Sequence, residues 1–289
     1  MTIATDVESP FTPVGLDALP PPQIARRAEQ IGEAKAAAGD ASTFVLAVLA
    51  GAFIAMGAIF ATTVMSGGSA MPYGVTRLLG GLVFSLGLVL VVVAGAELFT
   101  GNNLVVMAWA SRRVKTVRLL WIWTLVWVGN FVGAIATAGL MYETKQYTFG
   151  KGSVGETVLT IASAKTHLGW GQAVALGALC NALVCLAVWL TYGARTVADK
   201  ILAVIPPIAA FVASGFEHSV ANMYFIPIGL FVKHDHSFVA STTAIPHLSS
   251  LTWGRFLWHN LAPVTLGNIG GGALMVGALY WFVYLRAAE

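Results

Sequence analysis

The sequence predicts an all-α membrane protein with six transmembrane helices in two inverted three-helix repeats. First, 57% of the 289 residues are hydrophobic, only 10% are charged, and the mean hydropathy is +0.77, whereas soluble domains carry about 25% charged residues. Second, the apolar runs are long and continuous, as transmembrane helices require, and do not alternate as barrel strands do. Third, two of the runs are interrupted by polar residues in a matching pattern.

The first 40 residues form a segment apart from the predicted transmembrane domain, which takes residues 41–289. Residues 1–20 are rich in proline and polar side chains, which is typical of a mobile tail. Residues 21–38 begin with prolines, continue with helix-forming residues and end before Gly39, which predicts a helix. No apolar signal-peptide core is visible in this segment. We expect the helix either to be solvated or to lie along the membrane surface or over a pore mouth.

Four predicted spans are apolar runs long enough to cross a hydrocarbon core of about 30 Å. They cover residues 44–64, 119–141, 170–192 and 256–285. The charges gather between the spans, in a basic cluster at 112–118, a polar loop at 143–168 and a loop at 233–254. With six spans, ten of the 16 Lys and Arg residues fall on the side of the two termini, which predicts cytoplasmic termini.

The other two apolar stretches, residues 78–110 and 201–232, are too long for one crossing each. A continuous helix over either would measure on the order of 48 Å at about 1.5 Å per residue. Each stretch also carries polar residues near its middle, where a membrane span should be driest. We therefore predict that transmembrane helices 2 and 5 are broken at mid-membrane, with the loose backbone lining a protected cavity.

The two interruptions share one spacing, and so do the spans that follow them. GAELFTGN at residues 95–102 and GFEHSVAN at residues 215–222 place Gly, Glu and Asn at the same intervals. GNFVG at residues 129–133 parallels GNIGG at residues 267–271. The pattern predicts repeats over residues 41–142 and 168–286. Because each repeat has an odd number of spans, the copies must be inverted, which puts a substrate site near the membrane midplane.

Only Glu97, Glu217 and His218 are ionisable within the predicted spans, which makes them functional candidates. For the glutamates we favour a structural role supporting the helix breaks, together with Asn102 and Asn222, because a carboxylate can accept unpaired backbone N–H groups at a helix start.

His218 has no counterpart in the first repeat, where Leu98 takes its place. Its unperturbed pKa of about 6.5 would let it exchange protons with an anion in a permeation path. A hydrogen-bonded structural histidine is the alternative.

Other candidates surround this histidine. Thr100 is the hydroxyl expected opposite His218, although it can simply bond to its own helix. Lys165 precedes the fourth span and can attract anions, or belong to a solvated loop. A set of apolar side chains could form dry constrictions of the path or simply pack in the core. They are Phe84, Leu88, Leu98, Phe99, Val184 and Phe211. We predict no metal site and no cofactor, and we expect Cys180 and Cys185 to be free thiols.

At these residues the sequence resembles the formate–nitrite transporter family, and most closely its formate channels. The motifs are GAELFTGN at 95–102, ASGFEHSVANM at 213–223 and NLAPVTLGNIGGG at 260–272. MPYG at 71–74 and NALVCLAVW at 181–189 also look like the family. The resemblance covers about residues 20–286, and the phrase around His218 is specific.

The resemblance implies an aquaporin-like protomer in a homopentamer of the bacterial inner membrane, with one pore per protomer. It implies passage of small monovalent anions, coupled to protonation. By position, His218 would be the central pore histidine with Thr100 as its partner, and Lys165 the vestibule lysine. Asn181 and Asn268 would be polar groups near the path. The resemblance also assigns two constrictions: Phe84, Leu88 and Phe211 to the outer one, and Leu98, Phe99 and Val184 to the inner one.

Formate is the first expected substrate, with nitrite or hydrosulfide as alternatives in the same class. From another class, an intramembrane hydrolase using Ser214 or Ser219 with His218 is a distant alternative, because no third orienting group is evident. The formal charge of +3 gives no indication of a nucleic-acid partner. The expected partners are therefore the anion, the lipid bilayer and further copies of the chain.

Overall fold

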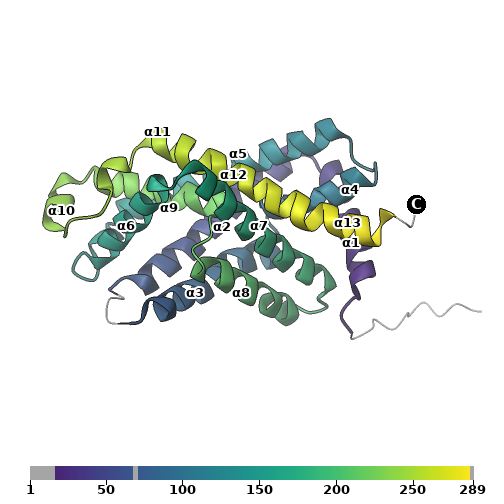
Figure 1. Cartoon of the computed structure of the whole chain (residues 1–289), viewed down its shortest axis with the longest axis horizontal. Coiled ribbons are helices and arrows are strands. Elements are labelled where there is room, and N and C mark those ends of the chain that lie inside the picture. Colours follow the sequence, from purple (N-terminus) through teal and green to yellow (C-terminus); the bar gives the residue numbers. More distant parts are fainter. Residues whose placement is uncertain (1–16, 68–70, 287–289) are drawn as a thin grey trace, which may run out of the picture.

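The computed structural model describes residues 17–67 and 71–286, and all regular structure in these residues is helical. Long helices run past one another along the molecule's longest dimension (Figure 1). Most of the predicted tail, residues 1–20, lies outside the described residues. Helix α1, Pro21–Ala37, matches the helix predicted from the prolines at its start.

The main helices after α1 follow the predicted apolar runs closely. In chain order they are α2 Asp40–Met65, α3 Tyr73–Ala94, α4 Val106–Ala110, α5 Thr116–Glu143, α6 Ser153–His167, α7 Trp170–Gly193, α8 Val197–Ala213 and α9 Ser219–Lys233. The rest are α10 His236–Ser241, α11 Trp253–Arg255, α12 Ala262–Ile269 and α13 Leu279–Tyr284, with short turns η2 Gly101–Val105, η3 Gln146–Thr148 and η4 Leu248–Ser250, and π-helical segments η5 Phe256–Leu261 and η6 Gly270–Ala278.

Five helices of the described residues are long and apolar enough to cross a membrane. They are Asp40–Met65, Tyr73–Ala94, Thr116–Glu143, Trp170–Gly193 and Trp253–Tyr284, and α9 is a shorter apolar helix. The last span is continuous from α11 to α13 through its π-helical segments. The prediction of an α-helical membrane protein is therefore confirmed for the helical class, with five candidate spans among the described residues.

One segment differs from the prediction, because the expected polar loop at 143–168 contains the 15-residue helix α6. Its apolar residues recur at helical spacing, with Val158, Leu159 and Ala162 buried. Ala162 packs so closely on α9 that a side chain at Gly229 would overlap its Cβ. Glu156, Lys165 and His167, near the two ends of α6, give the segment the composition of a loop. The structure places Lys165 on a helix and not in a loop.

Two helices end at a glycine in the left-handed region. Helix α3 ends before Gly95, with φ of 82°, and α8 is followed by Ser214 and Gly215, with φ of 73°. Glycine adopts this conformation without the penalty of a Cβ, which explains its place at both helix ends. Short non-helical segments follow, before the turn at Gly101–Val105 and before α9 at Ser219.

Close helix crossings rest on glycines in α5, α12 and η6. A side chain at Gly133 would overlap the Val48 carbonyl, and one at Gly271 would overlap the Ala178 carbonyl. These contacts bring α5 against α2, and the last span against α7, at backbone distance.

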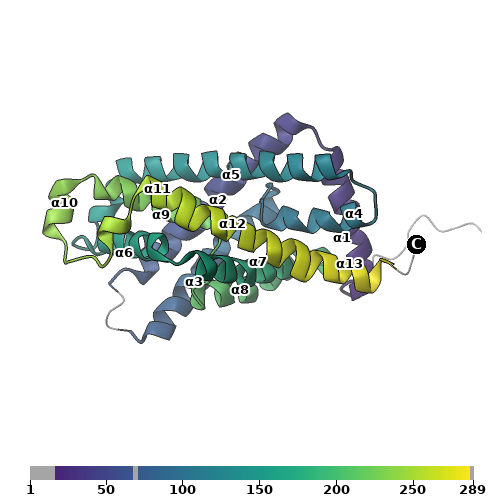
Figure 2. The same ribbon diagram turned by 45° about the horizontal axis from the view of Figure 1, so that its top comes forward.

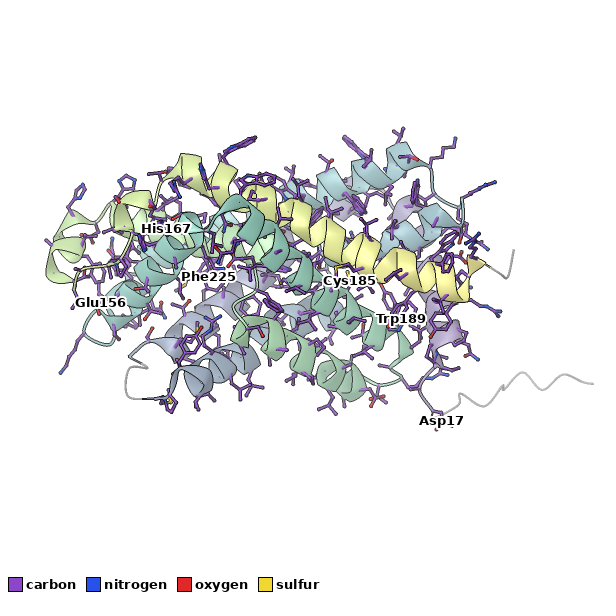
Figure 3. The ribbon with its side chains drawn as sticks, in the orientation of Figure 1. Asp17, Glu156, His167, Cys185, Trp189 and Phe225 are labelled. Atoms are coloured by element: carbon purple, nitrogen blue, oxygen red, sulfur yellow. The ribbon has the colours of Figure 1, made fainter. Side chains whose placement is uncertain are left out.

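Helix α6 and helix α10 lie at one end of the molecule, and α1, α4 and α13 lie at the other (Figures 1 and 2). Glu156 and His167 mark the first end and Trp189 lies toward the second (Figure 3).

Candidate functional site

Asn268 of α12 holds the segment between α8 and α9 in place. Its Oδ1 accepts a hydrogen bond from the Ser219 backbone N–H at 2.9 Å. Its Nδ2 donates to the Glu217 carbonyl at 2.9 Å and to the Gly177 carbonyl of α7 at 2.8 Å. The side chain is completely buried. Two of the bonds go to main-chain groups next to the start of α9, which a helix end leaves unpaired, and the third goes to a carbonyl inside α7. The amide that we expected near the path therefore ties the backbone together.

Asn130 of α5 makes the same set of bonds to the segment after α3. Its Oδ1 accepts from the Phe99 N–H at 2.9 Å, and its Nδ2 donates to the Glu97 carbonyl at 2.9 Å and the Ala47 carbonyl at 2.7 Å. The sequence marked Asn130 only through the spacing it shares with Asn268. Its role follows from its position on the neighbouring span, which spacing alone does not reveal.

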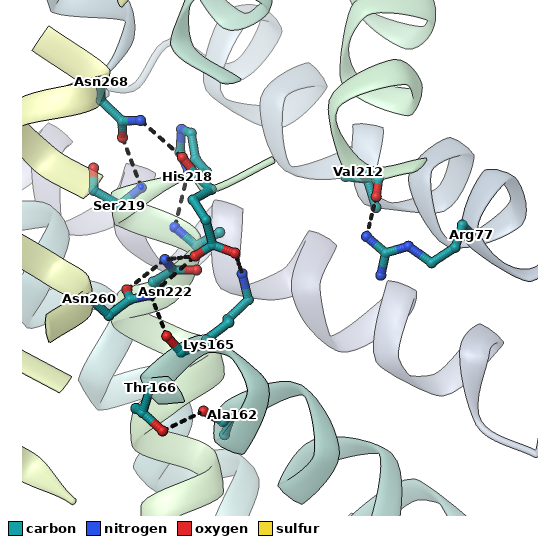
Figure 4. A network of polar contacts seen from close by, with 12 residues as sticks. Arg77, Ala162, Lys165, Thr166, Val212, His218, Ser219, Asn222, Asn260 and Asn268 are labelled. Atoms are coloured by element: carbon teal, nitrogen blue, oxygen red, sulfur yellow. Dashed lines mark hydrogen bonds and ion pairs between the residues drawn. The ribbon is translucent and has the colours of Figure 1, made fainter. Parts of the chain in front are cut away.

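Lys165, Asn222 and Asn260 belong to a buried polar network (Figure 4), and all three contact Glu217. Its carboxylate contacts Lys165 Nζ at 2.7 Å and accepts from Asn222 Nδ2 at 2.6 Å and Asn260 Nδ2 at 3.2 Å. We expected the carboxylate to accept backbone N–H groups instead. Those groups already have partners, because Asn268 takes the Ser219 N–H and His218 takes the Ala221 N–H. Asn260 was not singled out from the sequence.

Glu97 pairs with the N-terminal helix. Its carboxylate contacts Lys35 Nζ of α1 at 2.6 Å and accepts from Asn102 Nδ2 at 2.7 Å, and Lys35 also donates to Asn102 Oδ1 at 3.0 Å. Here too the carboxylate binds side chains and not backbone N–H groups. Lys35 was missed in the sequence, where the helix at 21–38 carries several charges and nothing marks this one.

His218 and Thr100 meet between the two interruptions. Thr100 Oγ1 lies 2.9 Å from His218 Nε2, and both residues are buried. His218 Nδ1 accepts a hydrogen bond from the Ala221 N–H at 3.0 Å, at the start of α9. A nitrogen that accepts carries no proton, so the neutral imidazole has its proton on Nε2 and donates it to Thr100 Oγ1. The Thr100 hydroxyl proton is then available to another acceptor.

Asn181 of α7 contacts the backbone of Thr100. Its Nδ2 donates to the Asn268 carbonyl at 2.7 Å and to the Thr100 carbonyl at 3.3 Å. Its buried Oδ1 has no hydrogen-bond partner among the described residues. Cys185 also donates to the Thr100 carbonyl, at 3.3 Å between sulfur and oxygen, and both cysteines are free and buried.

Two cavities lie near this pair. The first, of about 50 Å³, is lined by His218 and Lys165, and we call it the His218 cavity. The second, of about 270 Å³, is lined by Glu97 and Lys35, and we call it the Glu97 cavity.

The apolar candidates divide between the two cavities. Phe84 and Phe211 line the His218 cavity, and their rings are 5.6 Å apart at 83°. Leu98 and Leu88 line the Glu97 cavity. The resemblance grouped Leu88 with Phe84 and Phe211, but Leu88 does not line the His218 cavity. Phe99 and Val184 are buried and line neither of these cavities.

Fold and site together define a polytopic membrane protein in which a buried polar pair lies beside two cavities, as in channels and transporters of small solutes. The family described as formate/nitrite transporter matches residues 22–282. The chain belongs to this family.

Named relatives agree with the family. The chain is 44% identical over 273 residues to the formate channel FocA of Escherichia coli K12, covering 93% of this chain and 96% of the relative. It is 39% identical over 283 residues to a probable formate transporter of Methanothermobacter thermautotrophicus, covering 92% and 97%. A solved pentameric formate channel with formate bound superposes with a TM-score of 0.79 at 43% identity, covering 86% of this chain and 98% of that structure.

These findings confirm the resemblance and the expectation of a transporter and not an enzyme, because the family and these relatives are channels and transporters. The geometry also disfavours the hydrolase alternative. Both ring nitrogens of His218 are engaged, by Thr100 and by the Ala221 N–H, which leaves none to activate Ser214 or Ser219.

Proposed function

We propose that the protein is a channel for small monovalent anions, with formate as its preferred substrate and nitrite or hydrosulfide as alternatives. The observation that carries the proposal is the buried His218–Thr100 pair beside two cavities at opposite interruptions. A hydroxyl whose proton is free to donate suits an anion, since it replaces part of the hydration shell in a dry site. The names of the relatives point to formate.

We propose that transmembrane helices 2 and 5 are broken at residues 95–100 and 214–218, within two inverted repeats. Matching contacts support this. The Glu97 N–H donates to the Leu46 carbonyl as the Glu217 N–H donates to the Leu176 carbonyl. The bonds of Asn130 to the first break have the same pattern as those of Asn268 to the second.

The contacts favour a longer repeat than the sequence analysis proposed. Lys35 precedes Leu46 by the same interval as Lys165 precedes Leu176, and each lysine pairs with the glutamate of its own repeat. We therefore propose that α1 and α6 are equivalent first helices of the two repeats. They lie at opposite ends of the molecule, as inversion requires (Figures 1 and 2). The first 40 residues then include part of the channel unit and are not wholly separate from it.

We propose a homopentamer in the bacterial inner membrane with both termini cytoplasmic. The pentameric formate channel that this chain resembles supports the assembly, and the excess of basic residues on the side of the termini supports the orientation. The Glu97 cavity is then the cytoplasmic one, and the His218 cavity faces outward with Phe84 and Phe211 in its wall.

We also propose that His218 exchanges a proton with the permeating anion, while Lys165 attracts the anion from its side of the membrane. The bonding of the imidazole sets a condition on that exchange. A doubly protonated ring cannot accept the Ala221 N–H, so charging His218 breaks its bond to the start of α9. That bond re-forms when the ring returns to neutral with Nδ1 unprotonated, which favours release of the proton together with the anion as a neutral acid.

Flux of formate and nitrite into proteoliposomes containing the purified protein tests the function. The proposal predicts formate entry well above that of empty liposomes, and faster than nitrite, between pH 5 and 8. Faster nitrite entry would change the substrate within the same class. No flux of either anion, or of hydrosulfide, would overturn the channel.

A further inference from the structure

Arg77 reaches from the first turns of α3 to the end of α8, where the second interruption begins. Its guanidinium donates to the Val212 carbonyl, one of the last carbonyls of that helix (Figure 4). Its terminal nitrogen lies near the place that a side chain at Gly215 would occupy. The Val212 carbonyl also accepts the Gly215 N–H at 3.1 Å, so Arg77 adds a second donor to it. A cation at this position complements the negative end of the helix dipole.

Arg77 also lines the His218 cavity, together with Lys165 and His218. Its Nη1 lies 3.9 Å from the Met65 sulfur, and its buried Nε has no hydrogen-bond partner among the described residues. The described residues that line this cavity include no Asp or Glu, and the carboxylate of Glu217 pairs with Lys165 at 2.7 Å. Within the described residues Arg77 has no ion pair, so its charge is not neutralised.

The charge balance of the two cavities therefore differs. In the Glu97 cavity the charges of Lys35 and Glu97 cancel at 2.6 Å. In the His218 cavity, Lys165 is cancelled by Glu217 and one positive charge remains, that of Arg77. A fixed charge in a narrow, water-poor cleft raises the local concentration of counter-ions.

We propose that Arg77 is a selectivity-determining residue that concentrates monovalent anions in the His218 cavity before they reach Thr100 and His218. This inference rests on the proposed anion channel. It adds Arg77 to Lys165 as a group that attracts anions on this side, and it gives Arg77 the larger share, because Glu217 lies 2.7 Å from Lys165 and offsets its charge. Arginine suits the task because it keeps its charge even when it is partly desolvated.

The bond to Val212 offers a purely structural explanation, and two substitutions separate the two roles. Arg77→Gln removes the charge but keeps an amide donor for the Val212 carbonyl. Arg77→Lys keeps the positive charge and replaces the planar guanidinium group by an ammonium group. If charge matters, lysine preserves the function and glutamine does not. If only the bond to the carbonyl matters, glutamine preserves it.

The experiment measures initial formate flux in proteoliposomes, at formate concentrations well below and well above half-saturation, for wild type, Arg77→Gln and Arg77→Lys. Lys151→Gln is the control, because it removes one exposed positive charge outside both cavities. We expect Arg77→Gln to lower flux at low formate about five-fold with little effect at saturation. We expect Arg77→Lys to stay within about two-fold of wild type, and Lys151→Gln to be unchanged.

A readout on wild-type protein keeps the test independent of folding. Raising the concentration of an impermeant salt on the side of the His218 cavity should reduce flux at low formate more than the same salt on the other side, since salt screens an exposed charge. Equal salt effects on both sides, or wild-type flux in Arg77→Gln, would overturn the inference. Absence of anion flux in wild type would instead overturn the proposed function.

Discussion

The two helix interruptions are built alike and differ where chemistry is needed. Each has a left-handed glycine, a glutamate paired with a lysine, and an asparagine from the next span bound to its backbone. When Glu97 is aligned with Glu217, Leu98 stands opposite His218 and Thr100 opposite Val220. Each interruption thus supplies one polar group where the other is apolar, and the two groups meet at 2.9 Å. The features shared by the two interruptions build the scaffold, and the positions where they differ, Thr100 and His218, form the candidate site.

A second difference lies in burial. The side chains of Lys165 and Glu217 are 16% and 5% exposed, against 25% and 17% for Lys35 and Glu97. Asn260 adds a hydrogen bond to Glu217 and another to the Lys165 carbonyl. The second pair is therefore drier and more constrained, which makes the second interruption the more sensitive to mutation.

The asparagine ties should give the largest effects, and equal ones. Asn268→Leu and Asn130→Leu each leave one backbone N–H and one carbonyl of the interruption without a partner, at about 1–3 kcal/mol for each buried group. We expect each variant to lose at least about 2 kcal/mol of stability and to unfold at much lower temperature in detergent. A wild-type melting curve for either one would contradict the symmetric account.

Substitution of the two glutamates should destabilise the protein to different extents. Glu217→Gln leaves Lys165 buried without a counter-charge, which costs about 3 kcal/mol. Glu97→Gln should cost about 1 kcal/mol, because water reaches its pair more easily. Thermal unfolding of the two variants measures the difference. The double variant Lys165→Met with Glu217→Gln should recover much of the loss, and equal destabilisation by the two single variants would remove the proposed asymmetry.

Thr100→Val removes the hydroxyl at nearly constant volume. We expect formate flux to fall about ten-fold, equivalent to about 1.4 kcal/mol at the barrier. Thr100→Ser is the matched control, because it keeps the hydroxyl and should stay near wild type. The reverse change in the other interruption, Val220→Thr, should leave flux almost unchanged, and a large effect there would mean that the two positions are not distinguished as we propose.

Asn260→Leu should give the smallest effect, about 1 kcal/mol of stability. The substitution removes the bonds to Glu217 and to the Lys165 carbonyl and the one accepted from Asn222, but Glu217 keeps Lys165 and Asn222, and Asn222 keeps Glu217. Ile122 is the corresponding residue of α5, counted from the paired asparagines, so the first interruption already works without this amide. A loss as large as that of Glu217→Gln would show that Asn260 is essential to the network.

Spacing and hydropathy predicted the helical class, the spans and the polar stretches, because burial in a bilayer and helix length leave few alternatives. They did not predict α6, since its polar ends have the composition of a loop and its partner α9 is far away in the sequence. They also missed Lys35 and Asn260, which become significant only when distant helices bring them to Glu97 and Glu217. The roles of Asn130 and Asn268 depend on the segments that they contact in space. Neither segment alone predicts these roles.

The most direct test of the account is the pH dependence of formate flux in His218→Asn compared with wild type. Asparagine can still bond to Thr100 or to the Ala221 N–H, but it does not titrate between pH 5 and 8. We predict that wild-type flux changes across this range and that the variant's flux is lower and nearly constant. An unaltered flux and pH profile in the variant would contradict the proposal that His218, which has no counterpart in the first repeat, exchanges protons during transport.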